Sequence, residues 1–169
     1  ALGANLILTP EQVGQCIEAT GIGFMFAPNH HPAMRHVAPI RRELGVRTVF
    51  NILGPLTNPA NTEHTLMGVF SKELLVLMAK AMQALGSKHV LVVHSEDGMD
   101  EVSLSAPTFV CELKNNGLSE YTITPEQFGL TRAPMSELKV NNPQESKAML
   151  LAALNNQAGA ARDIVILNS

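Results

Sequence analysis

Four carboxylates lie within six residues of one another, at Glu96, Asp97, Asp100 and Glu101, in a stretch that also contains a glycine. This stretch follows an apolar run at residues 90–94 that is typical of a buried strand. Mg²⁺ commonly takes one or two carboxylates, while waters and substrate phosphates complete its shell. Spacing alone leaves two interpretations open: a Mg²⁺ site at the carboxyl end of a strand, or a solvated acidic turn.

A second stretch, residues 24–59, is rich in histidine, arginine and proline. Its short apolar runs at residues 24–27 and 48–50 predict two strands that end in loops, and residues 33–44 between them predict a helix. Ligands of open α/β sheets bind beyond the carboxyl ends of the strands. An arginine of this stretch could therefore clamp a carboxylate through paired N–H bonds, or it could be a solvated surface charge.

Other kinds of site are not indicated. The adjacent His30 and His31 have no cysteine or carboxylate at zinc-ligand spacing. Cys16 and Cys111 stand far apart in apolar company, which favours buried thiols and a cytoplasmic protein. The sequence contains no glycine-rich phosphate loop and no readable Ser-His-Asp arrangement, so we predict no catalytic residue and no cofactor-binding residue from it.

Composition restricts the partners. The 169 residues suit one domain or a large piece of one, and 46% of them are hydrophobic. A net charge of −3 gives no electrostatic footprint for nucleic acid or for a membrane surface. No signal peptide or spanning segment is visible in the sequence.

Predicted helices and strands, which must position these residues, alternate along the chain. Thr9 and Gln12 predict a capped helix to about Thr20, and later segments alternate strand and helix up to residue 94. Asn116-Gly117 then predicts an antiparallel hairpin. The fold class is therefore α/β, with a mainly parallel sheet flanked by helices and an antiparallel hairpin near the C-terminal third. The later predicted elements are strands at 64–70, 90–94, 108–113 and 118–123, with helices at 72–85 and 142–154.

The two ends also shape the expectation about domains. The sequence starts without methionine, and the apolar run at residues 164–167 resembles a helix that is cut short. We therefore expect residues 1–169 to form a single incomplete α/β domain of a longer protein.

Three motifs together resemble one enzyme family. They are residues 30–35 (His-His-Pro-Ala-Met-Arg), residues 40–59, which begin Ile-Arg-Arg-Glu-Leu-Gly, and residues 98–103 (Gly-Met-Asp-Glu-Val-Ser). Their order and spacing are similar to those of the anthranilate phosphoribosyltransferases, and the resemblance covers essentially the whole chain. It implies the large domain of the nucleoside phosphorylase and phosphoribosyltransferase type. It also implies transfer of a phosphoribosyl group from phosphoribosyl pyrophosphate to anthranilate, with release of pyrophosphate, in tryptophan biosynthesis.

The resemblance assigns roles to particular residues. Arg41 matches the arginine that holds the anthranilate carboxylate. Asp100 and Glu101 match the acidic pair that binds Mg²⁺ on phosphoribosyl pyrophosphate. The residues that match the aromatic pocket and its entry channel are His31, Gly54 and Pro55.

The resemblance also implies parts that lie ahead of residue 1. These are a glycine-rich pyrophosphate loop, a second substrate loop with lysine and asparagine, a metal-binding serine, and a small helical domain through which the family usually forms homodimers. We therefore expect residues 1–169 alone to be inactive.

Two alternatives stay open. A pyrimidine nucleoside phosphorylase shares the fold, but its pocket differs from the one implied by residues 30–59. A non-catalytic nucleic-acid-binding relative should lack the acidic pair and have a basic face, whereas this chain has Asp100, Glu101 and a net charge of −3.

Overall fold

The computed structural model describes residues 2–26, 30, 50–58, 60 and 62–169, which belong to two compact units. The smaller unit comprises residues 2–60 and the larger unit comprises residues 61–169. The predicted helix at 33–44, and with it His31 and Arg41, lies outside the described residues.

The smaller unit contains two described helices, α1 (Pro10–Thr20) and α4 (Phe50–Leu56). The predicted capping box of α1 is present: the Gln12 backbone N–H donates to Thr9 Oγ1 at 3.3 Å, and the Thr9 N–H donates to Gln12 Oε1 at 2.9 Å. The helix ends at Gly21, whose φ of 78° is left-handed.

Both strands predicted in the smaller unit are wrong where the structure describes them. Residues 24–26 have no regular secondary structure, and Phe50 begins α4 instead of ending a strand. A three-residue apolar run cannot distinguish a helix from a strand. The Gly54-Pro55 pair is typical of a loop, but both residues lie within α4, and Pro55, which has no N–H, removes one i→i−4 hydrogen bond from its last turn.

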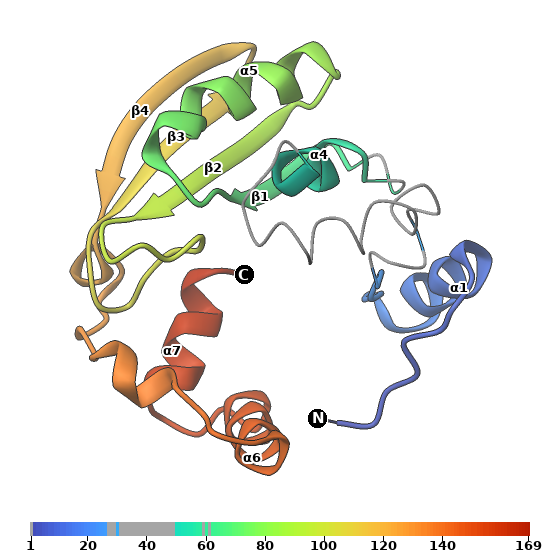
Figure 1. The fold of residues 1–169 in the computed structure, drawn as a ribbon, viewed down its shortest axis with the longest axis vertical. Helices are drawn as coiled ribbons and strands as arrows, with labels where there is room; N and C mark the ends of the chain where they lie inside the picture. The colour runs from blue at the N-terminus through green and yellow to red at the C-terminus, as the bar shows by residue number, and fades with distance from the viewer. Residues whose placement is uncertain (1, 27–29, 31–49, 59, 61) are drawn as a thin grey trace. The chain divides into compact units, whose positions relative to one another are not determined.

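The larger unit is built on a four-stranded sheet with the order β1-β2-β3-β4 (Figure 1). β1 (His64–Gly68) is parallel to β2 (His89–Ser95), and the connection between them runs through the short 3₁₀ helix η1 (Lys72–Leu74) and helix α5 (Leu75–Ala84). β3 (Thr108–Lys114) and β4 (Gly117–Ile123) are antiparallel to their neighbours.

The α/β class is confirmed, but the described sheet is mixed and not mainly parallel. It has one parallel pair and two antiparallel pairs. The alternation of strand and helix stops after β2, where a loop without a crossover helix returns the chain and so makes β3 antiparallel. The predicted hairpin is present, since Lys114 pairs with Gly117 and the turn residues Asn115 and Asn116 have φ values of 51° and 59°.

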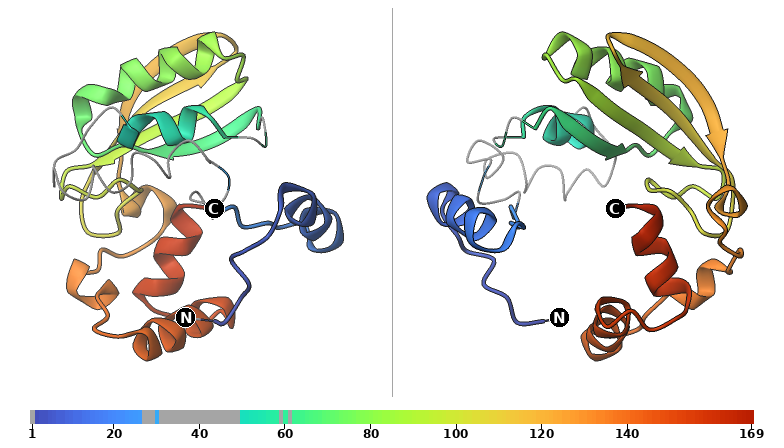
Figure 2. Two further views of the ribbon diagram at one scale, coloured as in Figure 1. Left: turned by 45° about the vertical axis from the view of Figure 1, so that its right-hand side comes forward. Right: turned by 180° about the vertical axis from the view of Figure 1, so that it is seen from behind.

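The core lies on both faces of the sheet. Successive side chains of β2 point to opposite faces, so Val92 and Val93 contact different partners. Val93 packs with Val102 and Val110, and Leu167 of α7 (Ala160–Leu167) lies against this cluster. Helix α5 lies along β2 and β3 and buries Met78 among other side chains (Figures 1 and 2).

The remaining elements of the larger unit follow the hairpin. They are the 3₁₀ helices η2 (Pro125–Phe128) and η3 (Met135–Leu138), then α6 (Pro143–Leu154), which packs against α7. Within the part of the chain that the structure describes, no helix combines the length and the apolar character that crossing a bilayer needs.

Candidate functional site

The acidic stretch lies at the carboxyl ends of the parallel strands. Gly68, the last residue of β1, pairs with Val93 of β2, and the Val69 N–H donates to the Val93 carbonyl at 2.9 Å. The loop of residues 96–107 leaves β2 two residues later. This is the end of a parallel pair where α/β proteins bind ligands. We call residues 96–107 the acidic loop.

The acidic loop touches the end of β1 through backbone. A Cβ atom built on Gly68 would lie 1.5 Å from the Asp100 carbonyl oxygen and 2.6 Å from its carbonyl carbon. No side chain fits in that space, so only glycine allows the Asp100 backbone to approach β1 this closely.

Buried hydroxyl groups fix the next part of the loop. The Ser95 hydroxyl donates to the Glu101 carbonyl oxygen at 2.6 Å, and Ser95 Oγ lies 2.6 Å from Thr108 Oγ1. The Ser103 N–H donates to Ser95 Oγ at 3.1 Å and to Thr108 Oγ1 at 3.0 Å. Ser95, Ser103 and Thr108 are at most 1% exposed, so their polar groups are satisfied inside the protein.

The Asp97 carboxylate accepts hydrogen bonds from within the acidic loop. Its Oδ2 accepts hydrogen bonds from the hydroxyls of Ser103, at 2.6 Å, and Ser105, while its Oδ1 accepts from the Met99 N–H at 3.2 Å. Partial burial raises the pKa of Asp97, but the hydrogen bonds from Ser103 and Ser105 outweigh it and leave that pKa below its ordinary value.

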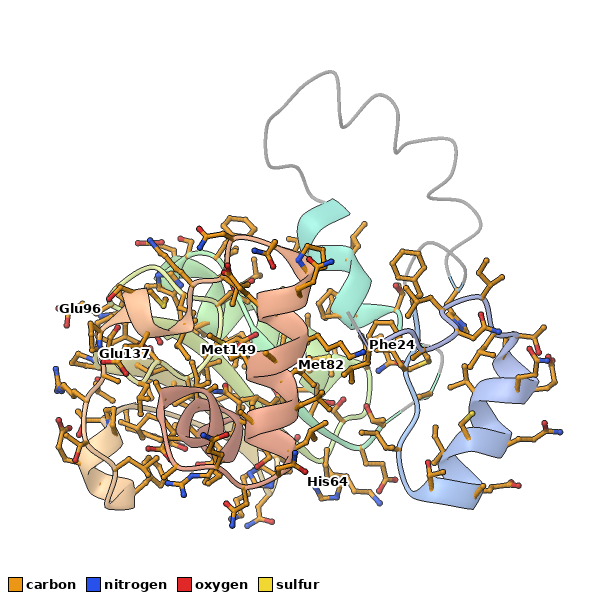
Figure 3. All side chains as sticks on the ribbon, turned by 90° about the horizontal axis from the view of Figure 1, so that it is seen from below. Phe24, His64, Met82, Glu96, Glu137 and Met149 are labelled. Carbon is orange, nitrogen blue, oxygen red and sulfur yellow. The ribbon has the colours of Figure 1, made fainter. Side chains whose placement is uncertain are left out.

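Asp100 and Glu101 differ from Asp97 in their surroundings. Both are exposed, and neither carboxylate forms a hydrogen bond or ion pair with any residue of the described ranges. Their backbone is held, whereas their side chains face solvent. Glu96 is also exposed, and Figure 3 shows it at the margin of the larger unit.

This donor set fits a magnesium ion. Two carboxylates on a fixed backbone match the one or two that Mg²⁺ takes from a protein when substrate phosphates supply the rest. Within the described ranges, no three His, Cys, Asp or Glu side chains gather as a metal cage of their own. The arrangement therefore suits a metal that arrives with a phosphorylated substrate.

Asn168, near the end of the larger unit, also holds the acidic loop through hydrogen bonds. The Asn168 side chain accepts a hydrogen bond from the Val102 N–H at 2.8 Å and donates one to the Val102 carbonyl at 2.9 Å. This pair of bonds joins the residue after α7 to the residue after Glu101.

In the smaller unit, Gly54 and Pro55 lie in the last turn of α4. Pro55 is exposed and Gly54 is half-buried. The Thr57 hydroxyl donates to the carbonyls of Leu53, at 3.0 Å, and Gly54, at 3.3 Å, so it caps the end of the helix. Together with the position of His31 and Arg41 outside the described residues, this leaves the predicted anthranilate pocket untested.

Sequence reasoning missed Gly68, Ser95 and Thr108, and it included Ser103 only as the last residue of the 98–103 motif, without a role. A glycine inside an otherwise apolar strand is a known sign of close backbone approach, so Gly68 could have been found. Serine and threonine at two strand ends gave no such sign, because their pairing depends on the antiparallel register of β2 and β3.

Comparison with known protein families gives a clear match. The model of the glycosyl transferase family, a/b domain, matches residues 1–169. The chain belongs to this family. An anthranilate phosphoribosyltransferase of a Polaromonas species is 62% identical to it over all 169 residues.

Two solved structures of an anthranilate phosphoribosyltransferase are similar to the chain in fold. The anthranilate phosphoribosyltransferase of Saccharomyces cerevisiae in complex with PRPP and Mg matches 99% of the chain with a TM-score of 0.84 and 29% identity. The complex of that enzyme with 4-fluoroanthranilate matches 98% with a TM-score of 0.85 and 29% identity. The chain covers 49% and 51% of these two structures and 49% of the Polaromonas relative, so it spans about half their length.

Proposed function

We propose that this chain is part of an anthranilate phosphoribosyltransferase that transfers the phosphoribosyl group from phosphoribosyl pyrophosphate to anthranilate, in tryptophan biosynthesis. The observation that carries the proposal is the exposed Asp100–Glu101 pair, whose backbone is fixed at the ends of β1 and β2. Support comes from the relative that is 62% identical and from the yeast enzyme in complex with PRPP and Mg.

The reaction is a displacement at the ribose anomeric carbon. The anthranilate nitrogen forms a bond to that carbon, the bond to the pyrophosphate oxygen breaks with its electron pair, and the nitrogen then loses one proton to solvent water. Asp100 and Glu101 would hold Mg²⁺, which supplies charge neutralisation to the departing pyrophosphate. Arg41 would hold the anthranilate carboxylate by two parallel N–H bonds, and His31, Gly54 and Pro55 would line the ring pocket.

Most of the rate gain should come from positioning and electrostatics. An aromatic amine is largely neutral near pH 7, so no residue has to remove a proton before attack. This agrees with the sequence, which indicates no general base.

Three finer features are part of the same proposal. The fold is of the nucleoside phosphorylase and phosphoribosyltransferase type. The whole protein is a cytoplasmic homodimer that pairs through a helical domain. Residues 1–169 form one incomplete domain that is inactive alone. The length of the relatives, about twice that of this chain, supports the last feature.

A fluorescence assay tests the proposal. The complete protein is mixed with phosphoribosyl pyrophosphate, anthranilate and Mg²⁺, and the fluorescence change that accompanies formation of phosphoribosylanthranilate is followed. Parallel reactions contain a pyrimidine nucleoside with phosphate, or labelled RNA in a binding assay. Product from anthranilate alone supports the proposal. Phosphorolysis of the nucleoside, or RNA binding without any turnover, would replace it with the corresponding alternative.

A further inference from the structure

We propose that Gly68 and Ser95 are positioning residues that fix the main chain of Asp100 and Glu101 and thereby set the affinity of the acidic pair for Mg²⁺. The inference rests on the proposed function, because it assigns a role toward the metal that accompanies phosphoribosyl pyrophosphate. Neither residue carries a charge or would touch the metal itself. Each acts on the backbone of one member of the pair.

Gly68 acts by leaving space. The Asp100 carbonyl oxygen occupies the place where a Cβ at Gly68 would stand, at 1.5 Å. The clash would be with backbone atoms and not with the end of a flexible side chain, so the loop as a whole must move if residue 68 gains a side chain. β1 and β2 cannot give way easily, since Gly68 is paired with Val93 in the parallel ladder.

Ser95 acts by donating a hydrogen bond. The Glu101 carbonyl can only accept, so the single Ser95 hydroxyl proton points to it over 2.6 Å. In the contact between Ser95 Oγ and Thr108 Oγ1, Thr108 must therefore be the donor. Removing the Ser95 hydroxyl releases the Glu101 carbonyl, while the Ser103 N–H keeps Thr108 Oγ1 as its acceptor at 3.0 Å.

The chain offers a matched control for each residue. Gly117 lies in the same sheet, and a Cβ there would meet only the Lys114 carbonyl oxygen at an ordinary 3.5 Å. Thr108 is as buried as Ser95 and belongs to the same hydrogen-bond cluster, but it does not contact the Glu101 carbonyl. Gly68→Ala is therefore compared with Gly117→Ala, and Ser95→Ala with Thr108→Val.

The experiment measures metal binding directly. Mn²⁺ is titrated into the complete protein in the presence of phosphoribosyl pyrophosphate, and protein-dependent binding is followed by electron paramagnetic resonance. The Mg²⁺ concentration for half-maximal turnover and the melting temperature are measured on the same variants. Mutation of a residue that orients a metal ligand typically lowers the affinity for the metal by about 10- to 100-fold. We expect a loss in this range for Gly68→Ala, about 10-fold for Ser95→Ala, and less than about twofold for both controls.

The outcomes separate the inference from a purely structural role. A role in folding alone would lower the melting temperature of Gly68→Ala and Ser95→Ala while leaving Mn²⁺ affinity equal to that of the controls, and this result would overturn the inference. If Gly68→Ala does not fold, the comparison of Ser95→Ala with Thr108→Val decides in the same way. If the unchanged protein neither binds Mn²⁺ in the presence of phosphoribosyl pyrophosphate nor turns over anthranilate, the proposed function fails, and the inference fails with it.

Discussion

The acidic loop of the larger unit and helix α4 of the smaller unit both carry residues of the proposed site, but they are held in different ways. The acidic loop is tied to distant parts of the chain, because Gly68 lies against the Asp100 backbone and Asn168 bonds to Val102. The hydrogen bonds described at the end of α4 are local and run from Thr57 to the carbonyls of Leu53 and Gly54.

The difference matches the two proposed tasks. Two carboxylates that share one metal ion must stand at fixed positions, because their electrostatic effect depends on preorganisation. A pocket wall for an aromatic ring needs shape and little polar precision. We therefore expect substitutions in the acidic loop to act on metal dependence, and substitutions around residues 31–55 to act on anthranilate binding.

The largest expected effect tests whether the two regions suffice together. Residues 1–169 alone should show no measurable turnover with Mg²⁺, phosphoribosyl pyrophosphate and anthranilate. They contain no glycine-rich loop for pyrophosphate, and two carboxylates recruit Mg²⁺ weakly when phosphates are not held beside them. Turnover within about tenfold of the complete protein, from a stable monomer, would place the catalytic machinery in this half and contradict the prediction.

The next prediction concerns a double substitution that removes the charge of the acidic pair without loosening the acidic loop. In the complete protein, the double variant Asp100→Asn, Glu101→Gln should lose about 10²- to 10³-fold in turnover and require far more Mg²⁺. Its melting temperature should stay nearly constant, because both side chains are exposed and have no partner among the described residues. Normal Mg²⁺ dependence in this variant would show that the pair does not bind the metal.

The contrast between the two regions also explains which features the sequence could predict. Thr9 with Gln12 and Asn116 with Gly117 carry local signals, and both predictions, a capped helix and a hairpin, are confirmed. The direction of β3 had no local signal, so the prediction of a mainly parallel sheet was wrong. The strand predicted to end at Phe50 failed because its apolar run was too short to fix a secondary structure.

The site follows the same rule. The acidic pair was recognisable because its residues are adjacent in sequence and match a family motif. Gly68, which makes room for the Asp100 backbone, lies far from Asp100 along the chain. Only the folded sheet brings the two residues together. The assignment of metal binding to Asp100 and Glu101 stays a prediction until it is measured.

An effect of comparable size is expected on the anthranilate side. Arg41→Ala in the complete protein should cost roughly 2–5 kcal/mol in binding and turnover if the pair with the substrate carboxylate is desolvated. Arg41→Lys should recover only part of this, since a point charge cannot reproduce two parallel N–H bonds. The Mg²⁺ requirement should not change. An unchanged Michaelis constant for anthranilate together with unchanged turnover in Arg41→Ala would remove Arg41 from the site.

The smallest effect is expected for a substitution that loosens the acidic loop but leaves the charges of Asp100 and Glu101 in place. Asp97→Asn weakens the hydrogen bonds from Ser103 and Ser105, and it should lower the free energy of unfolding by about 1 kcal/mol because the residue is exposed and solvent screens the loss. Mg²⁺ affinity should change less than in Ser95→Ala, since Asp97 does not bond to the Asp100 or Glu101 backbone. A double-mutant cycle with Ser103→Ala measures the coupling directly.

The pH dependence of that effect has a definite sign. Hydrogen bonds hold the pKa of Asp97 in the folded protein below its ordinary value of 3.8, so folding favours the carboxylate. The stabilisation is complete above pH 3.8 and is lost as the pH falls through the lowered folded-state pKa. Denaturant unfolding should therefore separate Asp97→Asn from the unchanged protein at pH 7, and the difference should shrink in acid. A difference that stays constant down to pH 2 would mean that Asp97 stabilises the loop by shape and not by its charge.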